Sequence, residues 1–90
     1  MKLNLSRPLV FFDLETTGIN VGTDKILEIS MLKVMPDHTT HLRTELINPG
    51  MHIPVEVSKI HGIYDKDVVN KPQFEKLAPS ILDFLKGCDL

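Results

Sequence analysis

The chain has almost no cysteine, and this scarcity limits how the fold can be stabilised. Cys88 is the one cysteine among 90 residues, so no disulfide can form within the chain. Such cysteine usage is typical of proteins that work in a reducing compartment, and we expect a cytoplasmic protein.

Long hydrophobic runs and an excess of positive charge are also missing. The apolar segment at residues 9–12 is short and is interrupted by Asp13, so neither a signal peptide nor a membrane-spanning helix is expected, and no membrane partner. The formal net charge is −2, which gives no polybasic surface for nucleic acid. Binding of nucleic acid would need a local site in which metal ions neutralise phosphate. Length and composition predict one globular domain.

What the chain does have is a pair of acids in its first apolar stretch, LVFFDLETTG at residues 9–18. The Val- and Phe-rich start predicts a buried β-strand. Because alternate side chains of a strand share a face, Asp13 and Glu15 should point the same way as Phe11 and away from Phe12. Two carboxylates on one face of a buried strand repel each other and lose hydration. A Mg²⁺ or Mn²⁺ ion, which binds oxygen ligands, would compensate their negative charge. The spacing alone is equally consistent with a strand that ends at Phe12 and with two acids in a solvated loop.

The rest of the chain predicts two more strands and three helical segments. Turn signals at residues 36–38 and 48–50 separate the apolar segments, and the short connections favour an antiparallel meander. Residues 88–90 look like the entry to a further strand beside the first one. The expected elements are strands at 9–15, 25–35 and 39–47 and helices at 55–60, at 64–69 and from Pro72 to Gly87.

Taken in order, these segments resemble the DnaQ-like, DEDD-type 3′–5′ exonucleases, a family that includes polymerase proofreading subunits. Residues 10–18 are similar to the family's first exonuclease motif, and residues 25–29 to the strand that follows it. Residues 47–49 fit the loop after the third strand, residues 61–63 the His-Gly-Ile segment, and residues 71–87 the next helix. An Asp-x-Glu pair alone would be a weak signal, but the ordered series covers nearly the whole chain.

The resemblance implies an α/β, ribonuclease-H-like fold. Residues 1–90 would form its N-terminal half, a three-stranded antiparallel meander with C-terminal helices, as the N-terminal part of a single exonuclease domain. The second and third exonuclease motifs would lie beyond Leu90, so the fragment itself is expected to be inactive. The implied reaction is hydrolysis of phosphodiester bonds at single-stranded nucleic-acid 3′ ends, with release of nucleoside 5′-monophosphates. DNA is favoured over RNA as the substrate, and a polymerase is an expected partner.

The resemblance also implies the site residues. Asp13 and Glu15 would be catalytic and would ligate metal, with two Mg²⁺ or Mn²⁺ ions in the complete domain. Asp13 would bridge the two ions, and Glu15 would ligate one ion and orient the attacking water. The residues expected to bind substrate are Asp13, Leu14, Glu15, Thr17, Gly18, Glu56 and His61.

Several of these residues also have a plainer interpretation. Thr17 and Gly18 are sufficient for an ordinary turn, and His61 suits the C-terminal end of a helix, where the dipole favours a basic side chain. Glu28 is either a partner of the Thr16–Thr17 turn or a solvated acid.

Two other functions stay open. The chain could be a non-catalytic module that binds a nucleic acid or nucleotide through Thr17 and His61. It could also be a structural or oligomerising segment. Without a returning strand, the first strand leaves an apolar edge unpaired, and we expect the fragment to self-associate through that edge.

Overall fold

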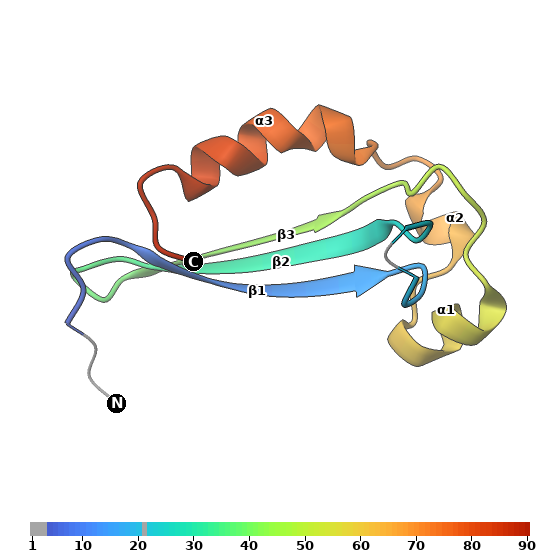
Figure 1. Cartoon of the computed structure of the whole chain (residues 1–90), viewed down its shortest axis with the longest axis horizontal. Helices are drawn as coiled ribbons and strands as arrows, with labels where there is room; N and C mark the ends of the chain where they lie inside the picture. Colours follow the sequence, from blue (N-terminus) through green and yellow to red (C-terminus); the bar gives the residue numbers. More distant parts are fainter. Residues whose placement is uncertain (1–3, 21) are drawn as a thin grey trace.

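A computed structural model describes residues 4–20 and 22–90 (Figure 1). All the expected strands and helices are present, with ends shifted by one or two residues. The elements are β1 (Leu9–Thr16), β2 (Ile26–Val34), β3 (Thr40–Leu46), α1 (Val55–His61), α2 (Asp65–Val68) and α3 (Phe74–Leu85).

The three strands form one antiparallel sheet in the order β1-β2-β3, which confirms the predicted meander. The alternative in which the first strand ends at Phe12 is wrong, because β1 continues to Thr16. In the register of the β1–β2 pair, Ser30 lies opposite Asp13 and Glu28 opposite Glu15. The pairing shifts between Glu15 and Thr16, so a bulge marks the end of the strand next to the acids.

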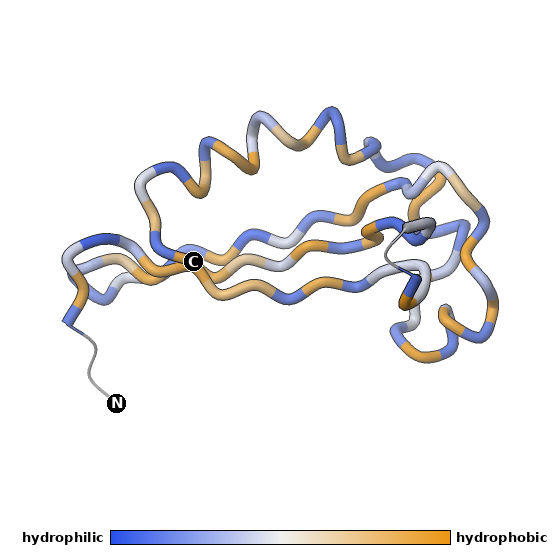
Figure 2. The backbone as a smooth tube through the Cα atoms, in the orientation of Figure 1, coloured by the Kyte–Doolittle hydropathy of each residue, from blue (hydrophilic) through white to orange (hydrophobic). Residues whose placement is uncertain are grey.

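Helix α3 covers one face of the sheet (Figure 1). Its buried Ile81 packs in a cluster with Val10, Ile29, Met31 and Ile47. Hydrophobic and hydrophilic residues alternate in the second half of β1 and over part of β2 (Figure 2), as expected for strands that bury one face more than the other. Because Val10 faces α3, the odd-numbered residues of β1, including Asp13 and Glu15, project from the opposite face of the sheet.

A second apolar cluster attaches α1 and α2 to the end of the sheet that carries Thr16 (Figure 1). Leu27 of β2 is fully buried there, against Ile53, Ile63 and Val68. The carboxylate of Asp65 accepts a hydrogen bond of 2.9 Å from the Ile53 backbone N–H. This contact joins the start of α2 to the segment before α1, so the two short helices are positioned by tertiary contacts more than by their own length.

The end of the chain returns to the start of β1. Asp89 forms an isolated parallel bridge with Leu9, which agrees with the expected entry to a further strand. Within the described part of the chain, no helix is both long enough and apolar enough to cross a membrane.

Candidate metal and nucleotide site

The acidic pair occupies the half of β1 that leads into the bulge. Asp13 is exposed, and Glu15 is half-buried. Both belong to the face that α3 leaves uncovered, with Ser30 and Glu28 as their neighbours on β2. The structure therefore brings together the two carboxylates that the sequence predicted to share a face.

Among the residues that the structure describes, no cationic side chain compensates these acids. Across residues 4–20 and 22–90, neither Asp13 nor Glu15 takes part in a salt bridge or a side-chain hydrogen bond. Glu28 adds a third acid directly opposite Glu15, and like charges in that relation repel. A divalent cation with hard oxygen ligands would relieve this repulsion. The donor set thus suits Mg²⁺ or Mn²⁺ in chemical type.

The same donor set is incomplete for a tightly held ion. Among the residues that the structure describes, no group of three or more His, Cys, Asp or Glu side chains is arranged to hold a metal. Octahedral Mg²⁺ takes six oxygen ligands, and two carboxylates supply only a part of them. Asp13 and Glu15 therefore fit one side of a metal site.

Thr17 follows the bulge and is buried, with 1% of its surface exposed. Its hydroxyl donates to Asp24 Oδ1 at 2.8 Å and accepts from the Lys25 backbone N–H at 3.0 Å. Its own backbone N–H donates to the Lys25 carbonyl at 2.9 Å. Because both groups are already used inside the protein, the predicted contact of Thr17 with substrate stays a prediction. The geometry itself supports a role in holding the turn.

Leu14 and Gly18 flank this part of β1. Leu14 is 45% exposed, but it projects from the face opposite to Asp13 and Glu15. The backbone N–H of Gly18 lies 3.4 Å from Thr16 Oγ1, and that hydroxyl donates to the Gly18 carbonyl at 2.5 Å. Leu14 and Gly18 are therefore close to the two acids in the sequence. The Leu14 side chain, however, points away from the face that carries Asp13 and Glu15.

Glu56 and His61 lie at the two ends of α1. Glu56 is exposed in the first turn, and His61 is the last helical residue, before Gly62 with φ of 79°. His61 Nδ1 accepts the Ile63 backbone N–H at 3.0 Å, so a neutral ring carries its proton on Nε2. That Nε2 atom is buried and has no hydrogen-bond partner among the described residues. An unpaired buried donor is costly, and an acceptor on a ligand would satisfy it.

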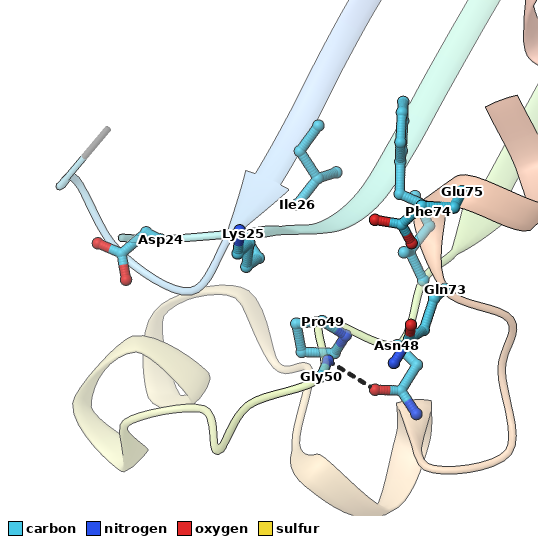
Figure 3. A pocket seen from close by; sticks show the side chains of 10 residues that line it. Asp24, Lys25, Ile26, Asn48, Pro49, Gly50, Gln73, Phe74 and Glu75 are labelled. Carbon is cyan, nitrogen blue, oxygen red and sulfur yellow. Dashed lines mark hydrogen bonds between the residues drawn. The ribbon is translucent and has the colours of Figure 1, made fainter. Parts of the chain in front are cut away.

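A hollow of the described surface lies elsewhere. A cavity of about 500 Å³ lies between the start of β2, the loop after β3 and the start of α3 (Figure 3). Lys25, Asn48 and Gln73 are among its lining residues, and the Gly50 backbone N–H donates to Asn48 Oδ1 at its edge. None of the predicted site residues lines this cavity. It is therefore separate from the acidic pair.

Asp24 is a residue that the sequence interpretation missed. It is half-buried, and its carboxylate lies against the turn that follows the acidic pair. The sequence signal that could have identified Asp24 is the short loop between β1 and β2. A short loop between paired strands brings its first and last residues close together. The Thr at its start and the Asp at its end are a natural hydrogen-bonded pair.

Comparisons with known proteins support the resemblance inferred from the sequence. The RNase_T family model, described as Exonuclease, matches residues 10–90. The DNA polymerase III subunit epsilon of Treponema pallidum is 38% identical over 76 residues, which cover 84% of this chain and 35% of that protein. A DNA polymerase III PolC-type of Caldanaerobacter subterraneus subsp. tengcongensis is 32% identical over 87 residues, which cover 97% of this chain and 6% of that protein.

A solved structure of exonuclease X in complex with 5′ overhanging duplex DNA has the same fold over most of the chain. The TM-score is 0.70 at 27% identity, and the match covers 81% of this chain and 42% of that one. This likeness confirms the predicted α/β class and the ribonuclease-H-like exonuclease fold for the N-terminal portion. The chain spans less than half the length of each of these three proteins.

Proposed function

The chain belongs to the exonuclease family that the RNase_T model describes, and we propose that it is part of a metal-dependent 3′–5′ exonuclease. The substrate would be a single-stranded nucleic-acid 3′ end, and the product a nucleoside 5′-monophosphate. The single observation that carries the proposal is the pair Asp13 and Glu15. The two carboxylates leave β1 on one face and have no cationic partner among the described residues.

Hydrolysis at a 3′ end exchanges one bond to phosphorus for another. The oxygen of a water molecule bonds to the phosphorus and loses a proton. The bond from phosphorus to the 3′ oxygen of the preceding nucleotide breaks, and that oxygen gains a proton. Divalent cations, when bound, stabilise the attacking and the leaving oxygens.

Different residues of the chain would bind the cations and the nucleotide. Asp13 and Glu15 would hold the cations from one side, and Glu15 would also orient the attacking water. The exposed Glu56 and the unsatisfied Nε2–H of His61 would bind the terminal nucleotide. Gly18, two residues beyond the end of β1, would contact that nucleotide. Leu14 is also proposed to contact it, although its side chain leaves the other face of the sheet.

The substrate and partner follow from the relatives by analogy. Relatives named as a DNA polymerase III PolC-type and a DNA polymerase III subunit epsilon support DNA over RNA and a polymerase as a partner. The isolated 90-residue chain is proposed to be inactive, because the pair of acids supplies only part of a metal site.

The test uses the full-length protein and a 3′-labelled single-stranded oligonucleotide with Mg²⁺. We expect Asp13→Asn to lower kcat by on the order of a hundredfold or more, because loss of even an outer-shell partner of a metal ligand costs about 10–100-fold. Asp83→Asn is the matched control, since Asp83 is an exposed acid on α3, which covers the other face of the sheet. Undiminished cleavage by Asp13→Asn would refute the assignment.

A non-catalytic nucleic-acid- or nucleotide-binding module is the second candidate. The observation that favours it is the lack of a three-ligand metal group among the residues described. A chelator separates the two functions. Oligonucleotide binding that is unchanged by EDTA, together with no cleavage in Mg²⁺ or Mn²⁺, would support the binding module and exclude the exonuclease.

A further inference from the structure

Asp24 lies beneath the turn that follows the acidic pair, and we infer that it is a positioning residue of the proposed exonuclease site. It acts through Thr17 and the backbone of residues 16–20. The inference rests on the proposed function, because the turn matters only if a nucleotide binds beside Asp13 and Glu15.

The Asp24 carboxylate joins two points of the loop. Oδ1 accepts the Thr17 hydroxyl at 2.8 Å, and Oδ2 accepts the Asn20 backbone N–H at 2.7 Å. Hydrogen bonds to a charged acceptor are stronger than those between neutral groups. One side chain thus holds the residue after the bulge and the residue at the far side of the turn.

Thr17 also links the turn to Lys25, the residue before β2. Its hydroxyl accepts the Lys25 N–H while it donates to Asp24, and its backbone N–H donates to the Lys25 carbonyl. All these atoms lie directly after the β-bulge between Glu15 and Thr16. The direction in which the chain leaves β1, just beyond the Glu15 carboxylate, is therefore set by contacts that converge on Thr17 and Asp24.

Gly18 is needed for Asp24 to approach this closely. A Cβ atom at position 18 would lie 2.6 Å from Asp24 Oδ2 and 3.0 Å from its Cγ. The backbone of Gly18 is not in the left-handed region, in contrast to Gly50, Gly62 and Gly87. The glycine in this turn is thus explained by space for a carboxylate, and Gly18 and Asp24 form one structural unit.

The other end of the sheet offers a matched control. Asp37 Oδ1 also accepts one backbone N–H and one threonine hydroxyl, both from Thr39, at 3.0 and 2.6 Å. That turn joins β2 to β3 beside Val34, which pairs with Leu9 at the start of β1. Asp37 therefore has the same kinds of hydrogen bond at the end of the sheet remote from the acids.

The experiment measures KM and kcat for a single-stranded oligonucleotide in the full-length protein. We expect Asp24→Ala to raise KM by about tenfold, which corresponds to loss of a hydrogen bond to a charged group, with a smaller change in kcat. Asp24→Asn should recover part of the loss, because its amide oxygen can accept one of the two hydrogen bonds. Thr17→Val should resemble Asp24→Ala, because it removes the hydroxyl that Asp24 accepts, and Thr17→Ser should recover part of that loss. Asp37→Ala should leave KM unchanged.

The outcomes separate this inference from the function on which it rests. If the wild-type protein does not cleave, or if Asp13→Asn cleaves normally, the proposed function fails and the inference fails with it. If the wild type cleaves and Asp13→Asn does not, but Asp24→Ala has the KM of Asp37→Ala, only the positioning role is overturned. Equal losses of thermal stability in the two alanine variants would then assign Asp24 a purely structural role.

Discussion

Asp89 and Leu9 lie side by side in a parallel bridge, although they stand near opposite ends of the chain. The Val10 N–H donates to the Asp89 carbonyl, and the Asp89 N–H donates to the Pro8 carbonyl, each at 2.8 Å. The rest of the outer edge of β1 has no strand partner in the described residues, since β1 is at the edge of the sheet. Phe11 and Phe12 remain 51% and 42% exposed along it.

This free edge predicts that the isolated 90-residue chain associates with itself. Unpaired N–H and C=O groups beside exposed phenylalanines are a template for pairing with another strand. Light scattering over a concentration series should show a mass that rises above that of the monomer. Phe12→Lys should reduce the association, and Leu82→Lys, at a 69% exposed position on α3, should not. A monomer at every concentration would contradict the prediction.

Substitutions at two neighbouring positions on α3 are expected to change the free energy of unfolding by very different amounts. Ile81 is 5% exposed in the cluster between α3 and the sheet, whereas Leu82 is 69% exposed. We expect Ile81→Ala to lower the free energy of unfolding by about 2–4 kcal/mol through lost burial and a cavity. Leu82→Ala should change it by less than about 0.5 kcal/mol. Urea unfolding of the full-length protein measures both, and similar losses would mean that α3 does not pack as described.

Asp65 predicts a pH-dependent contribution to stability. The Ile53 backbone N–H, and then His52, lower the pKa of the Asp65 carboxyl from its ordinary value. Because the folded-state pKa is lowered, the stabilisation is fully present above the unfolded-state pKa and is lost as the pH falls through the folded-state pKa.

Unfolding curves at a series of pH values test this sign. Asp65→Asn should be less stable than the wild type from neutral pH down to the ordinary pKa of aspartate, near 4. The difference should shrink below that pH. The control is Asp83→Asn, at an exposed aspartate on α3. A difference between Asp65→Asn and the wild type that grows toward low pH would exclude the proposed linkage.

Gly18 and Asp24 predict non-additive effects on stability. Gly18→Ala would push the Asp24 carboxylate away from Thr17 and Asn20, and so would break the hydrogen bonds that Asp24→Ala also removes. The double variant should therefore lose less free energy of unfolding than the sum of the two single variants, by about 1 kcal/mol. Additive losses in a double-mutant cycle would show that the two residues act independently.

Much of the fold follows from local patterns in the sequence. The Val- and Phe-rich start of β1, the turn at residues 36–38 and the glycine at position 62 each favour one local conformation. The spacing of Asp13 and Glu15 likewise determines that they share a face once β1 is a strand. These features depend on neighbouring residues only, which is why element ends were predicted to within one or two residues.

Other features depend on contacts between distant segments, and no local pattern contains them. The sequence by itself determined the order of the strands and helices and the common face of the two acids. Only the tertiary structure decided that Glu28 stands opposite Glu15 and that Thr17 is buried against Asp24. The physical reason is that strand register, burial and loop closure are set by the packing of the whole chain, which brings together residues that the sequence keeps apart.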